Sequence, residues 1–246
     1  SAPEQHHDRV SRMVFAPSAI DEEAIEGPST SRPRRKSVNR GGARCFNTPK
    51  PPSASYGKAS DGRLINGCLL PKKGIGYVRK NPSGFGTDTV VATVQWATAQ
   101  VAKLYPGSVA VVVGALSRAQ GRRLHPHKSH QNGRDVDIGY FASGNRVLPH
   151  FRAMQRGNID VHKSWALLGA LLSTGRVQYM FIDYNLQALF HQHLKDLDTP
   201  QSTLERVFQF PRGRRARAGI IRHASGHADH FHVRFRCDAM DHDSCR

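Results

Sequence analysis

The sequence has few acidic residues, few aromatic residues and few cysteines, and each shortage narrows what the protein can be. Only 19 of its 246 residues are Asp or Glu, against 36 Lys and Arg, so the formal net charge is +17. A charge of this size favours an anionic partner and carries no information on the fold. Aromatic residues make up 8% of the chain, and no recognisable nucleic-acid-binding motif occurs. We therefore expect an anionic partner that is not nucleic acid.

Long apolar segments are also missing. No run of 18 apolar residues occurs in the chain, which predicts a protein that is not inserted in a membrane. Residues 1–5 are polar and do not form the apolar part of a signal peptide, so we expect either a cytosolic protein or a mature form that has lost its signal peptide. No internal repeat is visible.

The four cysteines favour disulfides over a metal or redox motif, because none of them lies in a Cys-x-x-Cys sequence. Cys237 and Cys245 bracket a short polar segment, and Cys45 and Cys68 bracket one rich in Pro and Ser. Of the three pairings that four cysteines allow, the spacing favours Cys45 with Cys68 and Cys237 with Cys245. Four free thiols in a cytosolic protein are the alternative.

Composition divides the chain near residue 44. Residues 28–44 are basic, rich in Pro, Gly and Ser, and without periodicity, which is typical of a linker or arm. We therefore expect a flexible basic segment, residues 1–44, followed by a domain, residues 45–246. The second part is long enough to bury a hydrophobic core.

Hydrophobic periodicity predicts both helices and strands in this domain. Thr87 is placed to cap a helix, which would end at the Pro-Gly pair 106–107. Asp160 begins a second helix, which would end at Gly175. Helices and strands interleave without a regular β-α-β spacing, so we expect an α+β fold with a small, mainly antiparallel sheet flanked by helices. The other expected elements are strands over 108–115, 135–141, 177–182 and 230–235 and a helix over 185–197.

The stretch 127–141 combines imidazole and carboxylate side chains with strand-like alternation. His130 precedes a Gln-Asn-Gly turn, and Asp137 lies in a strand whose apolar residues Val136 and Ile138 point to the opposite face. A strand would thus present a carboxylate to a loop histidine.

A second such stretch lies near the C-terminus, where Phe231, Val233 and Phe235 alternate with polar residues. A strand would bury these three and point His230 and His232 into one cleft. Together the two stretches offer His130, Asp137 and His232, the three-ligand set of a catalytic zinc site with an open fourth position, whereas Ca²⁺ and Mg²⁺ prefer oxygen ligands. No His-Glu-x-x-His motif occurs.

The combination of His-x6-Asp with a distant His-x-His resembles the superfamily of lysostaphin-type endopeptidases, D-Ala-D-Ala metallopeptidases and the hedgehog signalling domain. Within it, residues 129–138 and 227–237 are most similar to the penicillin-insensitive murein endopeptidases, and residues 66–69 are similar to that family's N-terminal segment. The resemblance covers roughly residues 60–246. It implies the same mixed fold, with a zinc site in an open groove.

The resemblance also implies roles for further residues. The first histidine of the His-x-His motif, His230, would act on the attacking water or the developing oxyanion, and His227 would assist it. A histidine at the position of His127 is associated with metal binding in the family, so His127 is a secondary ligand. Arg134 and Arg234 are the first candidates for charge in a substrate groove.

The function implied is a periplasmic or secreted zinc-dependent endopeptidase that cuts peptide cross-links of the peptidoglycan wall, at a D-Ala to meso-diaminopimelate type of bond. The positive charge suits an anionic wall polymer. A D,D-carboxypeptidase, an L,D-endopeptidase and an inactive hedgehog-like wall-binding module stay open as alternatives. A magnesium nuclease would explain the charge, but such nucleases use clustered carboxylates, and the stretch 127–141 offers only the pair Asp135 and Asp137.

Overall fold

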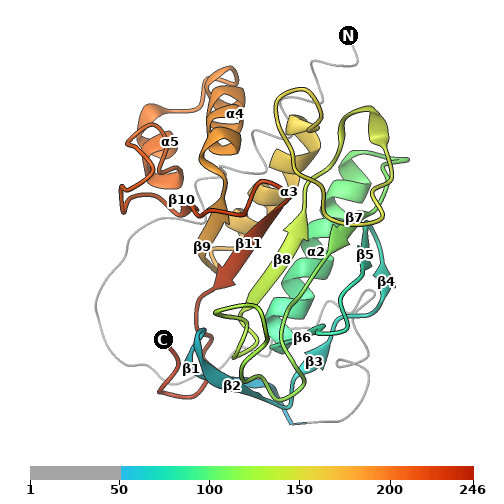
Figure 1. Ribbon diagram of the computed structural model, residues 1–246, viewed down its shortest axis with the longest axis vertical. Coiled ribbons are helices and arrows are strands. Elements are labelled where there is room, and N and C mark those ends of the chain that lie inside the picture. The colour runs from blue at the N-terminus through green and yellow to red at the C-terminus, as the bar shows by residue number, and fades with distance from the viewer. Residues whose placement is uncertain (1–50) are drawn as a thin grey trace, which may run out of the picture.

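A seven-stranded mixed sheet forms the centre of the computed structural model, which describes residues 51–246. Its strand order is β10-β9-β11-β8-β7-β5-β4 (Figure 1). Four of the six pairings are antiparallel, while β10 with β9 and β5 with β7 are parallel. The strands are β4 (Lys73–Gly74), β5 (Tyr77–Arg79), β7 (Val111–Val113), β8 (Asp135–Gly139), β9 (Val177–Ile182), β10 (Ile221–His223) and β11 (His230–Phe235).

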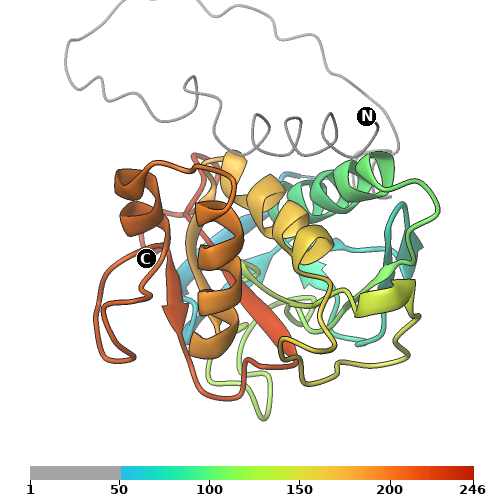
Figure 2. The same ribbon diagram turned by 90° about the horizontal axis from the view of Figure 1, so that it is seen from above.

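Helices cover one face of this sheet. The four α-helices described are α2 (Asp88–Leu104), α3 (Val161–Ser173), α4 (Tyr184–Lys195) and α5 (Gln201–Val207). Helices α2, α3 and α4 lie next to one another on this face (Figure 2). The loops that precede and follow β8 lie toward the other face, which Figure 1 presents to the viewer.

The predicted helix starts are confirmed by their caps. The Thr87 hydroxyl accepts a hydrogen bond from the backbone N–H of Val90, and the Asp160 carboxylate accepts one from the N–H of Lys163. These bonds satisfy backbone donors that have no partner within the helix. Gly175 follows α3 with φ 66°, a left-handed conformation that suits glycine.

Two small antiparallel pairs lie beside the main sheet. One joins β1 (Ala54–Lys58) to β2 (Asp61–Ile65), and the other joins β3 (Cys68–Leu69) to β6 (Phe85–Gly86). The sequence analysis predicted neither pair, and it also missed β4, β5, β10 and α5. A short 3-10 turn, η3 (Ser143–Asn145), lies in the loop that follows β8.

A continuous hydrophobic core extends from Cys68 to Phe235 and joins the sheet to α2, α3, α4 and α5. It supports one domain over the described part of the expected range 45–246, while residues 1–44 and Cys45 lie outside the described residues. The predicted Cys237–Cys245 disulfide is present. Cys68 is buried and disulfide-bonded as well. Within residues 51–246, every helix is too short or too polar to cross a membrane.

Candidate metal and catalytic site

The register of β8 and β11 places the predicted site residues on one face of the sheet. His232 lies opposite Asp137, and Arg234 lies opposite Asp135. Residues directly opposite in a sheet point to the same face, so these polar side chains share the face without helices. The alternate residues are fully buried on the helix side: Val136, Ile138, Phe231 and Val233.

The carboxylate of Asp137 is the centre of the cluster, and four imidazoles surround it. Its Oδ1 lies 3.0 Å from Nδ1 of His232, 3.2 Å from Nε2 of His130 and 3.8 Å from Nε2 of His230. Its Oδ2 lies 3.8 Å from Nδ1 of His127. Burial opposes ionisation of Asp137, but the neighbouring imidazoles of His130 and His232 outweigh it and hold its pKa below the ordinary value.

His130 is fixed in one tautomer by its backbone surroundings. Its Nδ1 lies 2.6 Å from the carbonyl oxygen of Leu116, and because a carbonyl can only accept, Nδ1 carries the proton. In the neutral ring Nε2 is then the nitrogen with the lone pair; it faces Asp137 and is buried without a hydrogen-bond partner. His130 also has φ 64°, and its backbone N–H donates to Oδ2 of Asp135 at 2.9 Å.

Asp135 lies behind the cluster and contacts both stretches that the sequence analysis singled out. It is fully buried, and Oδ1 lies 3.2 Å from Nε2 of His232 and 2.8 Å from Nε of Arg234. Burial opposes its ionisation, but His232 and Arg234 outweigh this effect and hold the pKa of Asp135 well below its ordinary value. The sequence analysis assigned Asp135 no role, although its spacing from Asp137 places both on one strand face.

His232 therefore lies between two carboxylates. Burial opposes protonation of its ring, but Asp135 and Asp137 outweigh burial and raise its pKa to about 9. When no metal is bound, His232 is an imidazolium at neutral pH; its Nδ1 donates to Oδ1 of Asp137, and its Nε2 lies 3.2 Å from Oδ1 of Asp135 without forming a hydrogen bond. Its Nδ1, on the Asp137 side, is the atom that a metal would take.

His230 is oriented by two neighbours that sequence reasoning missed. Its Nδ1 lies 2.6 Å from Oδ1 of Asp229, which leaves Nε2 directed toward Asp137. The ring of Phe151 stacks on His230 with centroids 4.9 Å apart and planes 11° apart. No periodicity could have indicated Phe151, because it comes from the irregular loop after β8.

His227 and His127 flank the cluster on the loop sides. The ring centroid of His227 lies 4.9 Å from that of His230, and its Nδ1 lies 2.9 Å from the carbonyl oxygen of Ser225. Burial lowers the pKa of His227, and burial together with His130 lowers that of His127. Both rings are therefore neutral at pH 7 and available as proton acceptors or ligands.

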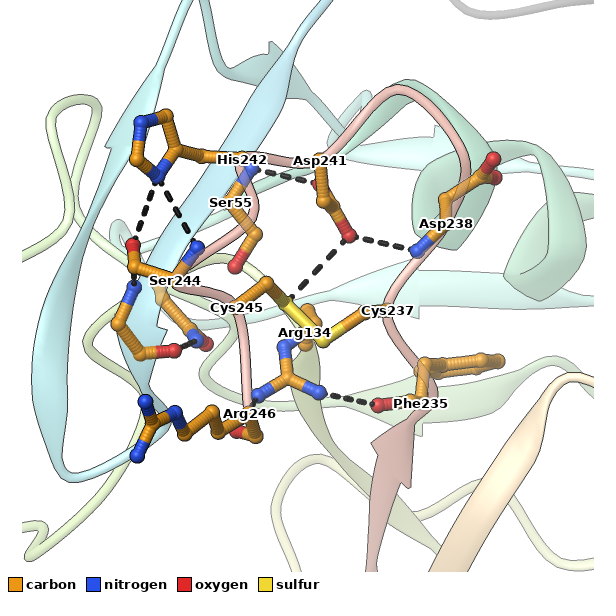
Figure 3. Close-up of a disulfide and its surroundings, with 12 residues drawn as sticks. Ser55, Arg134, Phe235, Cys237, Asp238, Asp241, His242, Ser244, Cys245 and Arg246 are labelled. Carbon is orange, nitrogen blue, oxygen red and sulfur yellow. Dashed lines mark hydrogen bonds between the residues drawn. A yellow bond between two sulfur atoms is a disulfide. The ribbon is translucent and has the colours of Figure 1, made fainter.

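Arg134 does not lie in the groove where it was expected. Its side chain is buried, Nη1 donates to the carbonyl oxygen of Phe235 at 3.0 Å, and Nη2 donates to that of Arg246 (Figure 3). The Cys237–Cys245 disulfide lies beside this contact. Arg134 thus holds the chain end against β8, so we assign it no contact with substrate.

Arg234 does lie on the open face, but its guanidinium is engaged. Nε and Nη2 bind the two oxygens of Asp135 at 2.8 and 3.2 Å. This two-point contact is the strong form of an arginine–carboxylate pair, and it leaves Arg234 with a supporting position behind His232.

The residues present fit a metal ion. Nε2 of His130 is an acceptor that faces another acceptor, Oδ1 of Asp137, at 3.2 Å, an arrangement that a cation between them would satisfy. The donor atoms of His127, His130 and Asp137 all lie within 4.8 Å of one another. This trio includes His127, the expected secondary ligand, and omits the expected ligand His232, whose ring centroid lies 4.7 Å from that of His130.

Fold and site together define a mixed α/β domain with a His/Asp cluster, able to hold a metal, on the open face of its sheet. Residues 55–169 match the model of the penicillin-insensitive murein endopeptidase family, so this segment of the chain is similar to that family. The match contains His127, His130 and Asp137 and ends before β9 and β11. No curated protein matches the chain. The family's activity is hydrolysis of peptide bonds in murein, which is peptidoglycan.

Proposed function

We propose that this protein is a zinc-dependent endopeptidase that hydrolyses peptide cross-links of peptidoglycan, at a D-Ala to meso-diaminopimelate type of bond. The observation that supports it most is the buried Nε2 of His130, which faces Asp137 beside a second imidazole, His232. Zinc takes such mixed nitrogen and oxygen sets, whereas calcium and magnesium prefer oxygen ligands throughout.

His130, Asp137 and His232 would hold the ion, with His127 as a further ligand. When bound, zinc lowers the pKa of a water molecule toward 7 and polarises a carbonyl group. The charge of Asp135, 3.2 Å from Nε2 of His232, favours a proton on that nitrogen and so leaves Nδ1 for the ligand position. The carbonyl oxygen of Leu116 accepts a hydrogen bond from Nδ1 of His130 and so leaves Nε2 of that ring for the ligand position.

His230 is the group we propose for proton transfer. Asp229 binds its Nδ1, so Nε2, the atom that points to the cluster, is free to accept a proton and return it to the leaving amine. Phe151 restrains the ring by stacking. His227, neutral and in contact with His230, is placed to donate or accept a hydrogen bond at the same reacting group.

The protein is proposed to act in the periplasm or outside the cell, where its substrate lies. The Cys237–Cys245 disulfide supports this location, since disulfides persist in oxidising compartments. The net charge of +17 suits an anionic wall polymer.

The proposal is tested by digesting purified peptidoglycan and identifying the released fragments by mass spectrometry, with and without a chelator. We expect chelator-sensitive release of un-cross-linked stem peptides, and re-addition of zinc should restore it. Release of single terminal residues would instead indicate a D,D-carboxypeptidase, and fragments cut at L,D bonds an L,D-endopeptidase. A protein that takes up no zinc would contradict the mechanism.

A further inference from the structure

The open face of the sheet continues beyond the metal cluster toward its β10 edge. His232 on β11 lies opposite Phe181 on β9, and Phe181 lies opposite Arg222 on β10. The three side chains therefore share the open face, as does Tyr179, which lies opposite Arg234. We call Tyr179, Phe181 and Arg222 the lateral strip.

Contacts connect the lateral strip directly to the proposed catalytic residues. The ring of Phe181 lies 5.5 Å from that of His232 and 6.3 Å from that of His227. All three residues of the strip are partly exposed. The strip is thus an aromatic floor that begins beside the metal ligands and ends at a positive charge.

The guanidinium of Arg222 is held in place and still has capacity to bind. Its Cζ lies 4.0 Å from the centroid of Tyr179, and Nε donates to the carbonyl oxygen of Gly219 at 3.0 Å. Among residues 51–246, no carboxylate lies within ion-pair distance of Arg222. Arg234, by contrast, is engaged by Asp135. Of the two, only Arg222 offers a free fork of donors.

The other side of the cluster is closed. The ring of Phe151 packs closely against Gly114 and Gly139. A Cβ added at Gly114 would lie 2.5 Å from Cζ of Phe151, and a Cβ added at Gly139 would lie 3.2 Å from Cδ1 of the same ring. An extended peptide at the cluster therefore has a wall on the β7 side and open floor on the β9 and β10 side.

From this arrangement we infer that the lateral strip binds the carboxylate-bearing arm of the peptide substrate, with Arg222 receiving a carboxylate and Phe181 and Tyr179 supporting the chain. Arg222 lies two strands from His232, about 10 Å, or roughly three residues of extended peptide. A planar guanidinium pairs with a carboxylate through two parallel hydrogen bonds. This inference rests on the proposed function and adds the substrate group that is recognised beside the cut bond.

The test compares two soluble cross-linked peptides. One carries free carboxylates, and in the other they are converted to carboxamides. For the zinc-loaded wild type we expect a KM on the order of tenfold lower for the carboxylate form, with similar kcat. Arg222→Gln should raise the KM for the carboxylate form to that of the carboxamide form, and Arg222→Lys should restore part of the difference.

Arg214→Gln is the matched control, because it removes the same charge from another tyrosine-stacked arginine. Arg214 lies over Tyr184 with Cζ 5.3 Å from the ring centroid, and it contacts Asn185 and His223, away from the strip. We expect this variant to discriminate between the two peptides as the wild type does. Equal losses in both arginine variants would mean a general charge effect and would overturn the inference.

Binding to the full chain after chelation, measured by titration calorimetry, separates this inference from the proposed function. The carboxylate peptide should bind wild type more tightly than the carboxamide peptide, and Arg222→Gln should abolish the difference. If the wild type cleaves neither peptide but binding follows this order, the proposed function fails and the strip stands. If Arg222→Gln weakens the binding of both peptides equally, or of neither, the proposed role of the lateral strip is refuted, whatever activity the wild type shows.

Discussion

The two faces of the β8 and β11 strand pair come from alternate residues of the same strands, yet they carry opposite kinds of chemistry. On the helix side, Ile138 and Phe231 are fully buried in the hydrophobic core. On the open side, Asp137 and His232 are also buried, but among charged and polar partners. Burial alone therefore does not separate structure from function in this strand pair. The kind of partner that each side chain contacts does separate them. Substitutions on the helix side should therefore change stability, and substitutions on the open side should change metal binding and activity.

The largest expected effect is on the open face. Asp137→Ala removes the acid that all four imidazoles contact, so zinc content and hydrolysis of peptidoglycan should both fall to background. Elemental analysis and fragment release measure the two. His150→Ala, an exposed histidine outside these contacts, is the control and should change neither. Full zinc content in Asp137→Ala would show that the metal site lies elsewhere in the protein.

A substitution on the helix face should lower stability and leave zinc binding unchanged. Ile138→Ala deletes a buried side chain and should lower the free energy of unfolding by about 2 to 5 kcal/mol. Zinc binding should persist at temperatures where the variant is folded, because Asp137 and His232 stay in register. Urea denaturation measures the first and elemental analysis the second. Val147→Ala, which is 75% exposed, should leave stability unchanged. Loss of zinc from folded Ile138→Ala would mean that the two faces are not independent.

Asp135 sharpens the comparison, because it serves the open face without contacting the reacting groups. Asp135→Asn weakens the charge that orients His232 and pairs with Arg234, so zinc affinity should fall by about 10- to 100-fold. Chelator competition measures the affinity. Asp61→Asn, at an exposed position on β2, is the control. Unchanged affinity in Asp135→Asn would show that backbone register alone positions His232.

The pH dependence of metal binding follows from the charge on His232. Because its pKa in the metal-free protein is raised to about 9, the ring is protonated at pH 7, and a metal that binds through Nδ1 must displace that proton. Zinc affinity should therefore rise as the pH is raised toward 9. Binding at pH 7 should release about one proton, measured by calorimetry in buffers of different ionisation enthalpy. An affinity independent of pH between about 7 and 9 would exclude His232 as a ligand.

The smallest effect is expected at the Cys237–Cys245 disulfide, which closes a short loop. The chain-entropy model gives at most about 2 to 3 kcal/mol for such a loop. Because Cys237 follows β11 and Arg134 bonds Phe235 and Arg246 nearby, reduction should speed the loss of zinc to a chelator while far-ultraviolet circular dichroism persists. Simultaneous loss of both signals would show that the loop supports the whole domain.

Local signals in the sequence predicted most of the core elements. Thr87 and Asp160 identify their helices because capping is a contact between near neighbours in the chain. Strand β9 agrees with its expected bounds because a short run rich in aliphatic and aromatic residues is a local signal of a strand. Strand β10 was missed, since three residues become a strand only through pairing with β9.

The candidate site divides in the same way. His130, Asp137, His230 and His232 were identified because their spacing is a motif, and the structure brings all four together. Phe151 and Asp229 act through packing that no spacing reveals. Arg134 was misplaced because an arginine in a basic sequence suggests an exposed position, whereas its partners are carbonyl groups from the far end of the chain.

The order of strands in the sheet determines when the candidate site can assemble during synthesis of the chain. Strand β11 comes last along the chain of all the strands described, yet it lies in the middle of the sheet, between β9 and β8. Until β11 inserts, β8 and β9 lack the strand that joins them, and His130 and Asp137 lack the imidazoles of His230 and His232. In an incompletely synthesised chain His130 and Asp137 therefore lack His230 and His232, and the proposed peptidoglycan hydrolase would be inactive until its last strand has been made and placed.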